Sequence, residues 1–237
     1  MSSSTATTPT DNTRELIAPW WHTILVLVPI AIGSVAGAYQ HGLPNANIPG
    51  MSFRLSSYIT VLAIEVIPVF LIWFALRRRG LSLDALVSGR WQTRGAFFRD
   101  LGLAVAFMAI AIPVVGVLLH FIGDNTESTL GNITPKTVPE LVVWLGLAAI
   151  GGFCEEVVFR GYLVRQFSAW TGNRGVALVI QGVAFGLAHG YYQRAMVVVM
   201  VQGWLLGLLA TWRKSLRPGI LAHVMQDALG GVVAFLS

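Results

Sequence analysis

Long apolar segments recur along the chain and alternate with short polar ones. A helix needs about 20 consecutive apolar residues to cross a bilayer. The pattern therefore predicts an all-α fold, a polytopic membrane helical bundle of about seven transmembrane helices. The predicted spans lie near 19–39, 56–76, 101–122, 139–163, 175–190, 195–212 and 218–236. The fifth span is short, which favours a tilted or partly interfacial helix.

The segments outside the spans complete the predicted organisation. Residues 81–98 mix apolar and basic positions, which is typical of an interfacial amphipathic segment and would add an eighth helical segment, broken near Gly89. Residues 1–15 are polar and rich in Ser and Thr, which predicts a disordered cytoplasmic tail. Residues 16–236 would form a single transmembrane domain, whose first helix is retained rather than cleaved as a signal peptide.

Composition and charge support a membrane protein and fix its expected orientation. Only 11% of the residues are charged and 55% are hydrophobic, whereas soluble domains carry about 25% charged residues. The net charge of +5 does not indicate nucleic-acid binding, because the basic residues cluster beside apolar spans. A cytoplasmic N-terminus places twelve Lys and Arg residues in inner loops and three in outer loops. The positive-inside rule therefore predicts a cytoplasmic N-terminus and an external loop at 123–138. The C-terminus would also be external, unless a re-entrant segment reverses it.

Several ionisable residues nevertheless lie within the predicted spans. A charge at the bilayer centre costs roughly 2.5–3.5 kcal/mol on insertion scales, so such residues are functional candidates. They are Glu65, His120, Glu155, Glu156, Arg160, His189, His223 and Asp227. Glu65 has no partner visible in the sequence, and His120 lies at a span end, where an interfacial position is expected.

The remaining candidates form polar stripes on three predicted helices. Glu156 and Arg160 are four residues apart, so they share a helix face and can neutralise each other. Glu155 points about 100° away from Glu156 and is free to face another partner. The same four-residue spacing separates two further pairs, Phe185 with His189 and His223 with Asp227. Each stripe alone would suit a purely structural role, but three stripes that converge would form a polar intramembrane cavity.

This set of side chains suits hydrolysis of an amide bond. A carboxylate beside a histidine can activate water as a general base, and a second histidine with a polar neighbour can stabilise a developing oxyanion. Histidine and glutamate also ligate zinc, although the chain has no H-E-x-x-H pair on one helix. The single cysteine, Cys154, is expected to be a small buried hydrophobe rather than a nucleophile.

The three stripes also resemble the motifs of a known family. The sequences EEVVFR (155–160), FGLAH (185–189) and HVMQD (223–227) are similar to the EExxxR, FxxxH and HxxxN/D motifs of the CPBP intramembrane proteases. This family, also called the Abi or CAAX-protease family, includes the Rce1 endopeptidases that trim prenylated CAAX proteins. The resemblance covers about residues 140–236, so residues 139–236 would be the catalytic core. The N-terminal half matches only as generic membrane helices.

The resemblance implies a role for each motif residue. Glu155 would be the general base, acting with His189 on water, and His223 with Asp227 would form the oxyanion hole. The bracing residues would be Glu156, Arg160 and Phe185. Members that trim CAAX proteins carry Asn where this chain has Asp227. An ionised Asp cannot donate a hydrogen bond, so Asp227 must be protonated or must orient His223 instead.

Other hypotheses stay open beside the metal-free protease. A zinc protease would use Glu155, His189 and His223 as ligands, since metal dependence has also been argued for the family. A bacteriocin-immunity or scaffold protein would keep the fold without catalysis. A proton-relaying transporter is a further alternative, although the chain shows no inverted repeat.

The expected substrate is a membrane-associated protein or peptide, and the expected surroundings are the bilayer of a bacterial inner (plasma) membrane. The short loops favour a bacterial source for this multi-pass chain. Glu155 lies about 16 residues, or about 24 Å, into a span that starts outside near residue 139. This count predicts access to the site from the cytoplasmic side.

Overall fold

The computed structural model describes residues 16–39, 50–122 and 133–237. The predicted tail 1–15 and most of the predicted loop 123–138 lie outside these residues. The described chain folds into the elements α1 Trp20–Tyr39, α2 Phe53–Arg78, α3 Asp84–Val87, α4 Arg94–Ile122, α6 Val138–Glu155, η2 Glu156–Leu163, α7 Val164–Thr171, α8 Arg174–Ala188, η3 Gly190–Ala195, α9 Met196–Arg213 and α10 Arg217–Leu236.

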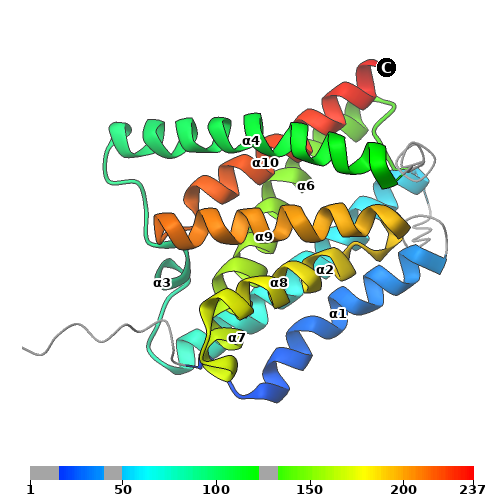
Figure 1. Cartoon of the computed structure of the whole chain (residues 1–237). Coiled ribbons are helices and arrows are strands. Elements are labelled where there is room, and N and C mark those ends of the chain that lie inside the picture. Colours follow the sequence, from blue (N-terminus) through cyan, green and yellow to red (C-terminus); the bar gives the residue numbers. More distant parts are fainter. Residues whose placement is uncertain (1–15, 40–49, 123–132) are drawn as a thin grey trace, which may run out of the picture.

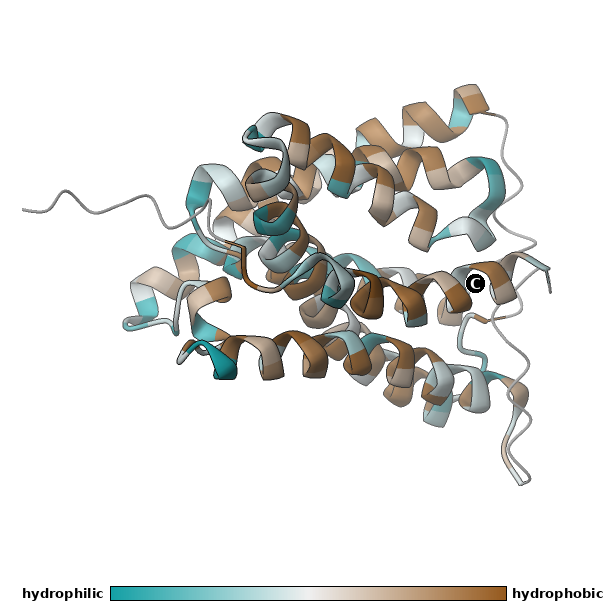
Figure 2. Ribbon diagram, turned by 90° about the horizontal axis from the view of Figure 1, so that it is seen from below, coloured by the Kyte–Doolittle hydropathy of each residue, from teal (hydrophilic) through white to brown (hydrophobic). Residues whose placement is uncertain are grey.

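The prediction of an all-α polytopic bundle is confirmed. Within the described ranges, six helices are long and apolar enough to cross a membrane, with α6, η2 and α7 counted as one helix from Val138 to Thr171. The predicted short fifth span is α8, which has 15 residues. Apolar residues, brown in Figure 2, run along the helices, and hydrophilic ones gather mainly toward their ends. The protein is therefore a multi-pass membrane protein.

Two element boundaries differ from the sequence prediction. The first part of the predicted interfacial segment 81–98 forms the short helix α3. This helix ends where Ser88 and Gly89 adopt positive φ angles of 74° and 73°. Its second part already belongs to α4, which begins at Arg94. The fourth span continues past residue 163 to Thr171. In this extension Gln166 of α7 is buried and hydrogen-bonds to the backbone of Ile17 and Ala18, just before α1.

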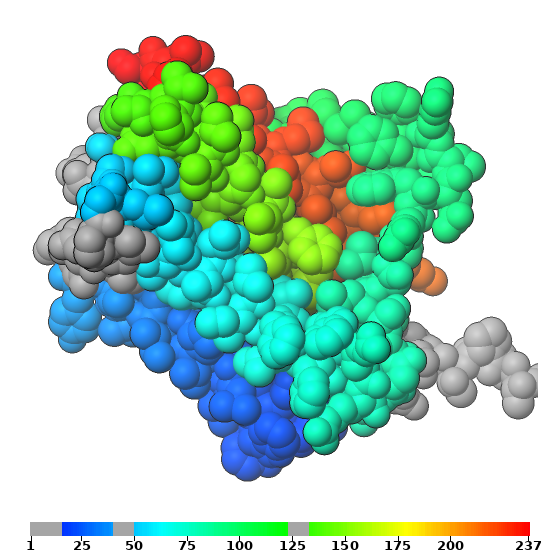
Figure 3. Space-filling model, turned by 180° about the vertical axis from the view of Figure 1, so that it is seen from behind, coloured from blue at the N-terminus to red at the C-terminus, as the bar shows by residue number. Residues whose placement is uncertain are grey.

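The α6–η2–α7 helix lies at the centre of the packing (Figure 1). Helices α2 and α10 pack on either side of α6 (Figure 3), and α8 packs against η2 and α7. Glycine permits the closest approaches. A Cβ on Gly186 of α8 would lie 2.6 Å from the carbonyl oxygen of Met196, and one on Gly152 would lie 2.9 Å from Val224 of α10. The antiparallel pair α8–α9 and the α6–α10 contact thus both depend on small residues.

The bundle has two chemically different ends. One end, called the arginine-rich end below, contains α3, the C-terminus of α2, the start of α4, the α7–α8 turn and the α9–α10 turn. Cross-links here include hydrogen bonds from Arg165 to the Ala85 carbonyl and from Ser88 to the Lys214 carbonyl. The other end, called the loop end, holds residues 133–137 and the last turn of α10. There Tyr58 donates to the Ile133 carbonyl.

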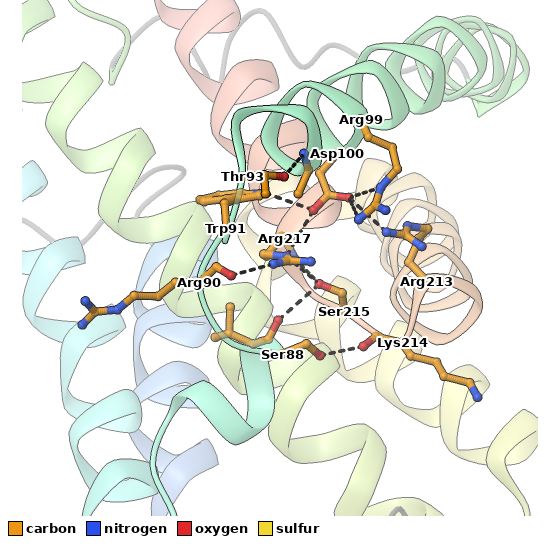
Figure 4. A network of polar contacts seen from close by, with 12 residues as sticks. Ser88, Arg90, Trp91, Thr93, Arg99, Asp100, Arg213, Lys214, Ser215 and Arg217 are labelled. Carbon is orange, nitrogen blue, oxygen red and sulfur yellow. Dashed lines mark hydrogen bonds and ion pairs between the residues drawn. The ribbon is translucent and has the colours of Figure 1, made fainter.

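A buried carboxylate, Asp100 of α4, joins three elements at the arginine-rich end (Figure 4). Arg213 and Arg217 each approach it to 3.1 Å, and Arg99 approaches to 3.5 Å. The indole of Trp91 donates a further hydrogen bond of 3.0 Å. Asp100 therefore fixes the start of α4 against the α9–α10 turn.

Candidate active site

The candidate site begins where α6 changes its helical form. Glu155 is the last residue of α6, and the next eight residues, Glu156–Leu163, form the π-helical segment η2. Such wider turns are rare and often occur at functional sites. Every residue of η2 is buried, so the side chains that follow Glu155 face protein rather than lipid.

Glu156 and Arg160 form a buried ion pair, as their spacing predicted. Their Oε1 and NH1 atoms are 3.0 Å apart, and both side chains are fully buried. The guanidinium carbon of Arg160 also lies 4.0 Å from the ring centroid of Phe185, which is a cation–π contact. Glu156 in turn accepts a hydrogen bond of 3.1 Å from Nδ1 of His223. One carboxylate thus neutralises the arginine of η2 and orients a histidine of α10.

Glu155 shares His223 with Glu156 and also faces His189. Its two carboxylate oxygens approach Nε2 of His223 at 3.3 Å and Nε2 of His189 at 3.7 Å. His189 follows the end of α8, where its Nδ1 donates a hydrogen bond of 2.8 Å to the Phe185 carbonyl. That bond holds the ring with Nε2 toward Glu155, at a separation longer than a direct hydrogen bond.

Asp227 is the least engaged of the predicted site residues. Its Oδ2 lies 3.7 Å from Nε2 of His223, and its side chain is 40% exposed. Its backbone carbonyl accepts a hydrogen bond of 2.9 Å from the indole of Trp144 on α6. The structure thus brings all the predicted motif residues together, with Asp227 at the margin of the group.

The structure adds residues that sequence reasoning missed or left without a role. Glu65 of α2 lines the same two cavities as Glu155. Tyr192 of η3 stacks on the His189 ring, with an angle of 2° between the ring planes. The pair Tyr191–Tyr192 directly follows the FGLAHG sequence, so its position was a usable signal. Glu155 lies 90 residues away from Glu65 along the chain, and no local pattern indicates that they share a cavity.

A cavity of about 140 Å³ opens on the loop-end side of Glu155. On α6 it is lined by residues that precede Glu155, such as Trp144 and Gly151, and Ile133 before α6 also lines it. A larger groove of about 860 Å³ shares Trp144, Tyr192 and Asp227 with it and reaches Lys136. On the opposite side, the buried residues of η2 close the site. The cavity and the groove beside Glu155 therefore lie toward the loop end and not toward the arginine-rich end, from which access was expected.

Two other predicted features concern metal and thiol chemistry. Among residues 16–39, 50–122 and 133–237, no group of three or more His, Cys, Asp or Glu side chains is arranged to hold a metal ion. Nδ1 of His223 is already engaged by Glu156. Cys154 is a buried free thiol, in keeping with the small hydrophobic residue expected from the sequence.

The Glu156–Arg160 pair predicts a specific stability loss. Arg160→Ala should lower the free energy of unfolding by about 3–5 kcal/mol, because it leaves the Glu156 carboxylate buried without its cation. Arg94→Ala, at an exposed position of α4, is the matched control and should change stability by about 0.5 kcal/mol or less. Thermal unfolding in detergent measures both. Equal midpoints for Arg160→Ala and the wild type would show that the pair is not structural.

Comparison with known proteins supports the motif resemblance. Residues 137–229 match the family model of the Type II CAAX prenyl endopeptidase Rce1-like proteins. No curated protein and no solved structure matches the chain. The matched segment runs from the residue that caps α6 to beyond Asp227, so it contains Glu155, His189 and His223. Residues 137–229, the part of the chain that brings these side chains together, thus carry the sequence signature of the Rce1-like CAAX prenyl endopeptidase family.

Proposed function

We propose that the protein is an intramembrane endopeptidase that hydrolyses a peptide bond of a membrane-associated protein or peptide. The observation that carries the proposal is the placement of Glu155 between two histidines on a cavity within the bundle. The family match over 137–229 supports the reaction class.

In the proposed mechanism, Glu155 and His189 hold and deprotonate the attacking water. Oε1 of Glu155 and Nε2 of His189 are 3.7 Å apart. This distance is too long for a direct hydrogen bond, but one water molecule can contact both atoms. The proton passes from water to the Glu155 carboxylate and then to the leaving amine. His223, as the imidazolium, donates from Nδ1 to Glu156 and from Nε2 to the oxyanion of the tetrahedral intermediate. The Asp227 carboxylate faces the same Nε2 and assists by orienting the His223 ring.

The proposed substrate enters from the loop end. The cavity at Glu155 and the groove beside it both extend toward residues 133–136. If the N-terminus is cytoplasmic, as the distribution of basic residues favours, this end is outside the cytoplasm. The cavity is lined by the carboxyl groups of Glu65, Glu155 and Asp227 and by no lysine or arginine. This charge balance favours a peptide segment without acidic side chains near the scissile bond.

Glu65 would act as a positioning residue for the general base. A hydrogen bond between two carboxyl groups requires a proton on one of them. With the proton on Glu65, the Glu155 carboxylate stays ionised and its orientation is fixed from α2. This role lies outside the segment 137–229 that matches the family model.

Glu155→Gln tests the general base and the metal alternative together. The change keeps the side-chain shape but removes basicity, so peptide cleavage should fall by about 10²–10⁴-fold while thermal stability is retained. The metal-free mechanism also predicts that chelators leave wild-type cleavage unchanged.

The two readouts separate three hypotheses. About one zinc per chain, together with inhibition by chelators that added zinc reverses, would favour the zinc protease with Glu155, His189 and His223 as ligands. Undiminished cleavage by Glu155→Gln would contradict both enzyme mechanisms and favour the non-catalytic scaffold.

The role of Glu65 predicts different outcomes for two substitutions. Glu65→Gln retains a donor toward Glu155 and should keep kcat within about tenfold of the wild type. Glu65→Leu removes the donor and leaves a buried acceptor unpaired, which costs about 1–3 kcal/mol. Its kcat should therefore fall by about 10–100-fold with little change in KM. A fully active Glu65→Leu variant, or equal losses in both variants, would contradict the positioning role.

Access from the loop end can be tested by cysteine labelling in intact cells. With Cys154→Ala as background, Leu147→Cys reports on the α6 wall of the cavity, and Lys136→Cys and Arg90→Cys mark the loop end and the arginine-rich end. A membrane-impermeant thiol reagent should label Leu147→Cys from the same side as Lys136→Cys. Labelling from the side of Arg90→Cys would contradict the proposed path, whichever way the chain is oriented in the membrane.

A further inference from the structure

The two sides of the α9–α10 turn differ in their charge balance. On one side, the arginines at 213 and 217 are neutralised by the buried carboxylate of Asp100 (Figure 4). On the other side lie Lys214 and two further arginines, Arg165 and Arg174. In the part of the chain that the structure describes, no acidic side chain forms an ion pair with any of these three.

A cavity of about 250 Å³ lies among these unpaired cations. It is formed where α3, the end of η2, the α7–α8 turn and the α9–α10 turn meet. Besides the three cations, it is lined by the hydroxyl-bearing residues Ser88, Thr211 and Ser215, and none of its lining residues is acidic. Its volume is several times that of one water, about 30 Å³. It can therefore hold an anionic group, and its basic side chains suit phosphate oxygens, whereas the hydroxyls of Ser88 and Ser215 already donate to backbone carbonyls.

The inner wall of this cavity includes Arg160 of η2, whose guanidinium is turned into the protein toward Glu156 and Phe185. Arg160 lines the cavity and is 4% exposed. Its NH1 pairs with Glu156, but its Nε has no hydrogen-bond partner among the described residues. The Arg160 side chain has no accessible surface, so the cavity's anion site is formed by the three cations that are not in ion pairs, Arg165, Arg174 and Lys214.

The depth of the cavity indicates which anion reaches it. Trp170 of α7 and Trp212 of α9 flank this end of the bundle and are 44% and 68% exposed. Exposed tryptophans mark the headgroup level of a membrane, and basic pockets between transmembrane helices at this level bind lipid headgroups. We propose that the cavity binds the phosphate group of an anionic phospholipid. This site is separate from the catalytic cavity and does not depend on proteolytic activity.

Binding of short-chain phosphatidylglycerol to the purified, delipidated full-length protein tests the proposal, with phosphatidylcholine and glycerol 3-phosphate as comparisons. Native mass spectrometry and thermal unfolding both report on binding. Phosphatidylglycerol should bind and raise Tm, whereas the other two should not. The double variant Arg174→Gln/Lys214→Gln should bind it about 30-fold more weakly, from the loss of two basic charges near the membrane surface.

Two control variants make the test specific. Arg77→Gln/Arg78→Gln removes the same charge at the same end of the bundle but lies outside the cavity, so it should bind like the wild type. Arg174→Lys/Lys214→Arg keeps the charge and should also retain binding. Equal weakening in both Gln pairs would indicate diffuse surface charge and overturn the proposal. Equal binding of phosphatidylcholine would overturn it too, and glycerol 3-phosphate binding as tightly as the lipid would identify a soluble phosphate ligand instead.

Discussion

The buried ion pair between Glu156 and Arg160 is the interaction on which the rest of the site depends. Removing two charges from water inside a bundle costs several kcal/mol per ion, which only close and complete pairing offsets. Arg160 meets this need with Glu156 and the face of Phe185, and Glu156 adds the imidazole of His223. These contacts come from η2, α8 and α10. The compensation of one charge pair therefore fixes three helices relative to each other.

Much of this arrangement follows from spacing in the sequence. Residues four apart on a helix share a face, so Glu156 with Arg160 and His223 with Asp227 could be predicted as pairs. The contacts of Glu155 with His189 and of Glu156 with Arg160 fit the helical geometry that turns the two carboxylates apart, although both also contact His223. The family resemblance then gave a reason for all three stripes to converge. What spacing cannot give is the π-helical form of η2, because no local residue pattern separates it from an α-helix.

The remaining errors have a common physical cause. Counting 1.5 Å per residue from a presumed membrane surface at residue 139 placed Glu155 near the arginine-rich end. The helix actually runs for 34 residues from Val138 to Thr171, so Glu155 lies near its middle. The side on which a cavity opens depends on which side chains fill the space, and here the buried residues of η2 fill the arginine-rich side. Glu65 was left without a role for a similar reason, since the cavity that it shares with Glu155 joins distant parts of the chain.

Arg160 also explains why the two ends of the bundle can carry opposite charge. On the loop-end side of η2, the cavity holds the carboxyl groups of Glu65, Glu155 and Asp227. On the other side, the polar side chains that line the second cavity are cations and hydroxyl groups, beside apolar residues such as Leu86 and Val164. Arg160 lies between them, bound to Glu156 and lining the cationic cavity. A single guanidinium thus lies between an acidic cavity and a basic one. Because low-dielectric protein screens charges less than water does, it matters that Glu156 neutralises Arg160, so that this pair adds no net charge beside either cavity.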